Sequence, residues 1–201
     1  MFGNAPGDAE SMSNENDLTE LDCAGRRRFL RASVAGAVLA AAPLSTMSTT
    51  VWAASERRLT LHNLHTGERI SQPYWMQGNY LPDSLAQINT VLRDHRSGEV
   101  YPIDPGLLDL LSALQNQIGP AKGYEVISGY RSPATNAKLQ SRSSGVAKRS
   151  LHMQGKAIDI RMPGTQLAQL HRAAKNMKAG GVGLYTGSNF IHVDTGRVRY
   201  W

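Results

Sequence analysis

Two histidines and one aspartate in the last quarter of the chain have the residue types that a catalytic zinc ion requires. His152 and Asp159 lie in one stretch with the sequence SLHMQGKAID, and His192 lies in a second stretch, FIHVD. Zinc in hydrolases is commonly held by three N or O ligands, and a water molecule in the fourth position has its pKa lowered to about 7. These residues therefore indicate metal-dependent hydrolysis, most directly of a peptide or amide bond.

Strand periodicity gives these side chains a direction. Side chains alternate between the two faces of a strand, so His192 and Asp194 share one face of the segment that contains them. Asp159 lies between Ile158 and Ile160, which places its carboxylate on the opposite face from these two apolar residues. We expect the carboxylate to face a cavity that borders its strand. Spacing alone does not distinguish a metal site from a structural cluster.

The elements that must position these residues are short strands and amphipathic helices. Period-two alternation predicts one hairpin and several strands, at residues 57–71 (the hairpin), 125–130, 182–185, 190–194 and 198–201. Apolar residues at helical spacing predict four helices, at about residues 83–97, 105–114, 133–139 and 165–177. No internal repeat or linker divides them. We expect one α+β domain in which helices flank a small antiparallel sheet.

The first 53 residues differ in composition from the rest. Residues 1–25 are rich in Asp, Glu, Asn and Ser, and we expect a flexible extension there. Residues 26–53 resemble a twin-arginine export signal, in which an arginine pair precedes Phe29 and Leu30 and an apolar run follows over residues 32–44. That run is shorter than the ~20 residues that span a bilayer. We expect cleavage after Ala53; an uncleaved anchor is the alternative, and N-terminal sequencing distinguishes the two.

The domain that remains, residues 54–201, is predicted to be basic and free of cysteine. Loss of residues 1–53 removes four arginines and six acidic residues, which raises the formal charge from +6 to +8. Outside the cytoplasm such a surface suits an anionic polymer such as the cell wall, whereas nucleic acid is not expected as a partner. The single cysteine, Cys23, precedes the cleavage point, which excludes a cysteine nucleophile. We expect a periplasmic monomer without stable membrane insertion after signal cleavage.

Three motifs resemble those of the M15 family of zinc peptidases. They are SGYRS at residues 128–132, SLH and GKAID within residues 150–159, and IHVD at residues 191–194. That family includes D-alanyl-D-alanine carboxypeptidases and shares its fold with the Hedgehog signalling domain. The resemblance covers about residues 57–201. It is closer to the exported branch resembling murein endopeptidase K, which opens cross-links between diaminopimelate residues of peptidoglycan.

The resemblance implies a role for each matching residue. His152, Asp159 and His192 are the implied ligands of one Zn²⁺ ion per chain. Arg131 is the implied catalytic and substrate contact, because a guanidinium can neutralise an oxyanion or hold a substrate carboxylate. Ser150 precedes His152 by two residues in a segment expected to be extended, so it would face the same way and could hydrogen-bond a substrate carboxylate.

One position departs from the family pattern. Many M15 enzymes place Glu or Asp three residues before the last histidine ligand as a general base, whereas this chain has Asn189, which cannot take a proton. Asp194 is the substitute candidate for the catalytic base, because it shares a strand face with His192. The alternative, equally open from the residues, is that Asp194 orients a histidine ligand.

Other conspicuous residues have structural interpretations. Four histidines are expected to be solvated at the surface, namely His62, His65, His95 and His171, with incidental metal binding by the first two as the alternative. The aromatic residues at positions 74, 75 and 80 are expected to pack a loop, or alternatively to line a substrate groove. The basic run at residues 142–149 is expected to be a solvated loop, with contact to the cell wall as the alternative.

These features predict a zinc-dependent murein endopeptidase that hydrolyses peptide cross-links, between diaminopimelate residues, during cell wall remodelling. One alternative is a D,D- or L,D-carboxypeptidase that acts on stem peptides. The other is a zinc-dependent wall-binding module without catalysis, which the Hedgehog relative illustrates and the Asn189 departure favours. A muropeptide digest distinguishes the three functions.

Overall fold

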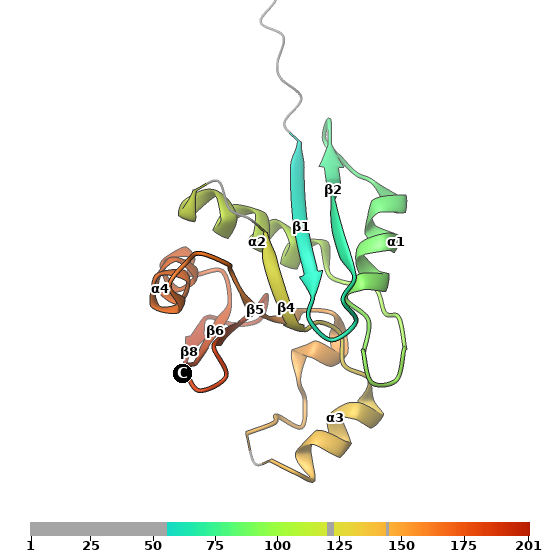
Figure 1. The fold of residues 1–201 in the computed structure, drawn as a ribbon, viewed down its shortest axis with the longest axis vertical. Coiled ribbons are helices and arrows are strands. Elements are labelled where there is room, and N and C mark those ends of the chain that lie inside the picture. The colour runs from blue at the N-terminus through green and yellow to red at the C-terminus, as the bar shows by residue number, and fades with distance from the viewer. Residues whose placement is uncertain (1–55, 120–122, 144) are drawn as a thin grey trace, which may run out of the picture. The chain divides into compact units, whose positions relative to one another are not determined.

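The computed structural model describes residues 56–119, 123–143 and 145–201 (Figure 1). The expected flexible extension at residues 1–25 and the expected export signal at residues 26–53 lie outside the described residues. Within the described ranges, none of the helices combines the length and the apolar character that a membrane crossing requires. The described elements from residue 57 onwards are eight strands and four α-helices with one short 3₁₀ helix, which confirms the expected α+β class.

An eight-stranded sheet forms the centre of the domain, with the strand order β3-β2-β1-β4-β5-β7-β6-β8. The strands are β1 (Arg57–Asn63), β2 (Arg69–Met76), β3 (Asn79–Tyr80), β4 (Tyr124–Ser128), β5 (Ala157–Arg161), β6 (Gly181–Tyr185), β7 (Phe190–Asp194) and β8 (Arg199–Tyr200). Two pairs, β1 with β4 and β6 with β8, are parallel, and the others are antiparallel. The expectation of a small antiparallel sheet is therefore wrong, since the sheet is larger and mixed.

Helices α1 (Pro82–Val91), α2 (Pro105–Ile118) and α4 (Leu167–Met177) cover one face of this sheet, whereas α3 (Pro133–Gln140) lies apart from it (Figure 1). Helix α2 packs on β1 and against α4, which in turn packs on β6 and β7, while α1 packs on β2 (Figure 1). A proline begins each of the first three helices, where its missing N–H leaves no hydrogen bond unmade. The hydrophobic core lies between these helices and the sheet.

Two local structures differ from the sequence expectation. Helix α1 ends at Val91 rather than near residue 97, because residues 94–99 form a turn closed by hydrogen bonds from Gly98 N to Asp94 O and from Asp94 N to Glu99 O. Ser150 does not lie in an extended segment around His152. It precedes a short 3₁₀ helix, η1 (Leu151–Gln154), which carries His152.

The two faces of the central strands differ in chemistry. Ile158 and Ile160 on β5, and Val193 on β7, are buried in the core on the helix side. Asp159 on β5 and His192 on β7 occupy the alternate positions, which face away from that core. This confirms the alternation predicted for these two strands, and it gathers the polar side chains on the face that the core leaves open.

The turn that ends η1 depends on a glycine. Gly155 has φ = 65°, a left-handed conformation that other residues adopt only with strain, and a Cβ at this position would collide with the carbonyl oxygen of Pro102. The Gly155 carbonyl also accepts a hydrogen bond from Asp104 N at 2.9 Å. Glycine is therefore the one residue that fits position 155, in the short loop between His152 and β5.

Replacement of this glycine should destabilise the fold. Gly155→Ala should lower the free energy of unfolding by about 2 to 5 kcal/mol, from left-handed strain together with the collision at Pro102. Gly67→Ala is the matched control, because Gly67 has φ = 74° but its Cβ would meet nothing within 4 Å; it should cost only about 1 to 2 kcal/mol. Urea unfolding measures both, and equal losses would contradict the proposed collision.

Candidate metal centre

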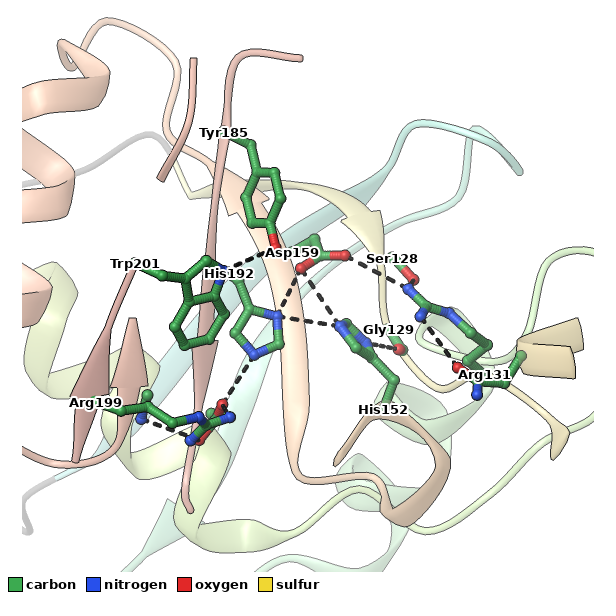
Figure 2. A network of polar contacts seen from close by, with 12 residues as sticks. Ser128, Gly129, Arg131, His152, Asp159, Tyr185, His192, Arg199 and Trp201 are labelled. Carbon is green, nitrogen blue, oxygen red and sulfur yellow. Dashed lines mark hydrogen bonds and ion pairs between the residues drawn. The ribbon is translucent and has the colours of Figure 1, made fainter. Parts of the chain in front are cut away.

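Three buried side chains converge on one point. His192 Nδ1 lies 2.9 Å from Asp159 Oδ1 and 3.2 Å from His152 Nε2, and His152 Nε2 lies 3.4 Å from the same Asp159 oxygen. The three donor atoms lie within 4.8 Å of one another (Figure 2). The structure thus brings together the three residues that the sequence motifs indicated as metal ligands.

The outer nitrogen of each imidazole ring has its own partner. His152 Nδ1 lies 2.7 Å from the carbonyl oxygen of Gly129, and His192 Nε2 lies 2.9 Å from Asp194 Oδ2. Both partners accept only, so each outer nitrogen carries the ring proton. In the neutral rings, the inner nitrogens then present lone pairs to each other and to the Asp159 carboxylate. Such an arrangement is stabilised by a cation at its centre, and N and O donors of this kind suit a divalent metal ion.

Strand register brings two of the three donors together. Asp159 on β5 is paired with His192 on β7, and His192 is paired with Gly183 on β6. Directly paired residues have Cβ atoms about 5 Å apart and lie on the same face. The aspartate and the histidine are therefore neighbours as a result of main-chain pairing, although they are far apart in sequence.

The third donor is held by the segment after β4. Gly129, which accepts the ring proton of His152, packs so closely on Leu92 that a Cβ would collide with the Leu92 carbonyl oxygen. Asp94, also in the turn after α1, accepts hydrogen bonds from Ser132 N at 2.9 Å and from Ser132 Oγ at 2.7 Å. The turn after α1 thus fixes residues 129–132, and these residues fix the His152 ring.

Asp194 is fully buried and is saturated with donors. Besides His192, its carboxylate accepts hydrogen bonds from Gly181 N, Gly196 N and both terminal nitrogens of Arg199, at 2.6 to 3.0 Å. It does not line the pocket described below. A general base needs access to a water molecule or to substrate, so this environment favours the second alternative for Asp194, the orientation of His192.

The pKa shifts agree with a closely packed charge cluster. Burial alone would raise the pKa of Asp159, but the charges of His152 and His192 and their hydrogen bonds lower it well below its usual range. Burial alone would lower the pKa of His192, but hydrogen bonds to Asp159 and Asp194 outweigh burial and raise it. The carboxylate is therefore ionised, as a metal ligand must be.

Arg131 lies beside the three donors, next to Asp159. Its Nη2 atom lies 3.8 Å from Asp159 Oδ2 and 3.4 Å from Ser128 Oγ, and its Nη1 atom lies 3.4 Å from Asn136 Oδ1 (Figure 2). The Arg131 Nε atom is buried and has no hydrogen-bond partner among the described residues. Burial lowers the pKa of the guanidinium while the charge of Asp159 acts in the opposite direction. The side chain retains hydrogen-bonding capacity for a ligand.

A pocket of about 440 Å³ opens in front of the donors. It is lined by His152, Asp159 and His192, by Arg131 and Ser150, and by residues 143, 145–147 and 149 of the loop before Ser150. Ser150 therefore borders the pocket as predicted, although as the residue before η1 and not as part of an extended segment. The loop that carries the basic run forms a wall of the pocket, which is more than the solvated loop that we expected.

The other predicted residues lie elsewhere. Asn189, at the position of the usual base, is exposed in the turn between β6 and β7 with φ = 52°, a conformation that asparagine tolerates well. His65 stacks on His95 with ring centroids 3.9 Å apart and does not pair with His62. Burial lowers the pKa of His95 to about 4. Tyr80 donates to Asp109, away from the pocket, so the aromatic residues near position 80 pack locally.

Several residues that line the pocket were absent from the sequence prediction, and three of them have side chains that can form hydrogen bonds. These three are Tyr185 at the end of β6, and Arg199 and Trp201 in and after β8. Gly183 was the only sequence signal for this side of the pocket. A glycine inside a strand pattern often marks the close approach of another group. The Trp201 ring occupies the space above Gly183, where a Cβ would lie 2.5 Å from the indole.

Comparison with known proteins identifies the family. The M15 peptidase model described as peptidoglycan L,D-endopeptidase MepK matches residues 51–201. The peptidoglycan L,D-endopeptidase MepK of Escherichia coli K12 is 45% identical over 179 residues, which cover 89% of this chain and 97% of that protein. The chain belongs to the M15 peptidase family. A probable M15 endopeptidase of the same name from Haemophilus influenzae is 43% identical over 146 residues, which cover 72% of this chain and 78% of the relative.

M15 membership makes this chain a peptidase, and it confirms the resemblance inferred from the three motifs. No solved structure matches the chain. The His152, Asp159 and His192 cluster supplies an M15 peptidase with the donor set that a metal ion needs.

The role of Asp194 leads to a prediction about metal affinity. Asp194→Asn breaks the ion pair with Arg199 and weakens the hold on His192, so the affinity for Zn²⁺ should fall about 10- to 100-fold. Competition with a chromophoric chelator measures this affinity. Asp109→Asn is the matched control, because Asp109 also combines an arginine partner, Arg57, with other donors but lies outside the pocket. Unchanged affinity in Asp194→Asn would contradict the orienting role.

Proposed function

We propose that this chain is a zinc-dependent murein endopeptidase, which hydrolyses peptide cross-links of peptidoglycan between diaminopimelate residues. The observation that carries the proposal is the cluster of the three buried side chains His152, Asp159 and His192. One nitrogen of each ring faces the other donors, and the second nitrogen of each ring already has its own partner. The names of the M15 relatives, which are L,D-endopeptidases of peptidoglycan, support the substrate class and the type of bond. We also propose that the fold is of the Hedgehog/D-Ala-D-Ala peptidase type.

One zinc ion per chain would be held by His152 Nε2, Asp159 and His192 Nδ1. When bound, zinc supplies a water molecule of lowered pKa and polarises a carbonyl oxygen. The chain's own contribution is to keep the two rings in the required tautomers, through Gly129 and Asp194, and to hold the carboxylate ionised. Tetrahedral coordination with three protein ligands leaves one position free, as in catalytic sites.

Arg131 is proposed to bind the oxygen of the scissile carbonyl or an adjacent substrate carboxylate. The guanidinium is largely buried, borders the metal donors and has an unused Nε–H among the described contacts. A fixed positive charge in a site of restricted water stabilises a developing oxyanion more than an exposed one does. Ser150, at the pocket wall, is proposed to hydrogen-bond the substrate as well.

The charge of the pocket suits an anionic peptide. Arg131, Arg149 and Arg199 all line it, and Asp159 is the only carboxylate among its described lining residues. Stem peptides of peptidoglycan carry free carboxylates, which such a pocket attracts. Endopeptidase action is preferred over carboxypeptidase action because of the M15 relatives' names, and a wall-binding module without catalysis is the remaining alternative.

We propose that residues 26–53 act as a twin-arginine signal, that the mature domain comprises residues 54–201, and that the protein acts as a periplasmic monomer. The family match over residues 51–201 supports this boundary, and relatives that act on peptidoglycan support an extracytoplasmic location. We propose that the protein has no nucleic acid partner and that it is not stably inserted in the membrane after signal cleavage.

The decisive experiment is a muropeptide digest with chromatographic analysis. The zinc-loaded protein should convert cross-linked dimers with a diaminopimelate–diaminopimelate bond into monomers, and prior removal of the metal with a chelator should abolish the conversion. Loss of a terminal D-alanine would instead show a carboxypeptidase. An unchanged digest with zinc bound would show a binding module.

A second prediction concerns Arg131. Arg131→Gln should lower kcat about 10²- to 10³-fold, the usual effect of removing one oxyanion donor, while zinc content stays near one per chain. Arg93→Gln is the control, because Arg93 also forms an ion pair, with Glu68 at 2.6 Å, but does not line the pocket. Steady-state kinetics on a purified cross-linked dimer provide the measurement. A wild-type kcat in Arg131→Gln would remove the residue from catalysis.

A further inference from the structure

The pocket has few groups that can contact a reacting bond besides the metal donors. Asp194 is buried behind His192, and Asn189 is exposed in a turn, so neither reaches the pocket. Among the described lining residues, the remaining hydrogen-bonding side chains are arginines, the indole of Trp201, and three hydroxyl groups, those of Ser143, Ser150 and Tyr185. The tyrosine is the one of these three that the sheet itself positions, because it ends strand β6.

Tyr185 lies on the same face of the sheet as the metal donors. It is two residues after Gly183, which is paired with His192, so the two positions share a face. Its ring stacks on Phe190 with centroids 4.6 Å apart, and 36% of the residue is exposed. In Figure 2 its hydroxyl points towards Asp159 and His192, and Arg131 approaches the donors from a different direction.

Trp201 fixes the direction of this hydroxyl. The indole Nε1–H donates a hydrogen bond of 2.9 Å to the Tyr185 hydroxyl oxygen (Figure 2). The tryptophan main chain is itself attached to β6, through hydrogen bonds from Trp201 N to Val182 O and from Leu184 N to Trp201 O. The indole therefore occupies one lone pair of the phenol oxygen, and the phenolic proton remains for another acceptor.

The surroundings of Trp201 leave little freedom for its ring. The ring lies over Gly183, with its centroid 5.3 Å from that of His192, and the Arg199 guanidinium lies 5.1 Å from the ring centroid. A side chain at position 183 would displace the indole, because a Cβ there would come within 2.5 to 2.8 Å of three indole atoms. The absence of a side chain at Gly183 thus makes the Trp201–Tyr185 hydrogen bond possible.

We propose that the Tyr185 hydroxyl is a further catalytic group, which donates a hydrogen bond to the scissile carbonyl oxygen as that oxygen gains negative charge, and that Trp201 is its positioning residue. This inference rests on the proposed endopeptidase function. The phenolic proton stays on Tyr185 throughout, so no additional acid, base or co-reactant is required. Together with Arg131, which also lines the pocket, the developing charge then has two donors that approach from different directions.

Kinetics of four variants on a purified cross-linked muropeptide dimer test this assignment. Tyr185→Phe keeps the stack on Phe190 but removes the donor, so kcat should fall about 10²-fold or more with KM little changed and zinc content near one per chain. Trp201→Phe keeps an aromatic ring but loses the indole N–H, and kcat should fall roughly 2- to 10-fold. Tyr200→Phe is the control, because its hydroxyl bonds to Lys175 O and it does not line the pocket; it should leave kcat unchanged.

The double variant separates a positioning role from a merely structural one. If Trp201 acts through the Tyr185 hydroxyl, Trp201→Phe should cause no further loss of kcat in the Tyr185→Phe background. Equal losses in both backgrounds would overturn the positioning role. A wild-type kcat in Tyr185→Phe, alongside an active wild-type enzyme, would overturn the catalytic role alone. A zinc-loaded wild-type protein that cleaves no muropeptide would overturn the proposed function and this inference together.

Discussion

The site depends on three donor groups that the fold brings face to face. His152 Nε2, His192 Nδ1 and an Asp159 oxygen lie within hydrogen-bond distance or close to it, and the outer nitrogen of each ring is held by its own partner. A cation bound between the three groups would contact all of them, because the outer partners, Gly129 and Asp194, keep both rings directed at the same point. Metal binding and the local fold therefore stabilise each other.

Much of this arrangement follows from one row of paired residues across three strands. Asp159, His192 and Gly183 lie side by side on β5, β7 and β6. A register shift of one residue in β7 would place the His192 ring in the core and a core valine at the metal. The apolar alternation of β5 and β7 resists such a shift, so the same hydrophobic pattern that builds the core also holds the metal donors in place.

The sequence was sufficient for the parts of the structure that depend on local pattern. Strand alternation correctly predicted which side of β7 carries His192, and prolines correctly marked the starts of α2 and α3. The parallel pairing of β1 with β4 was not predictable in this way, because it joins segments separated by two helices and is decided by packing of the whole sheet. Trp201 was missed for the same reason: its contact with Gly183 is set by the pairing of β8 with β6, which leaves no periodic signal. The argument that favours an orienting role for Asp194 over a base rests on its burial, which the sequence does not give.

The turn after α1 has a wider consequence. Leu92 and Asp94 hold residues 129–132, and Gly129 in turn holds the His152 ring. Helix α1 and strand β2, on which it packs, are therefore joined to the metal donors by a series of hydrogen bonds and packing contacts. The portion of the domain that supplies no ligand is thereby coupled to the ion. Binding of a metal ion to the three donors would therefore reduce local unfolding in helix α1 and strand β2, although neither contacts the metal. Without the ion, this region would open more often and become sensitive to proteases.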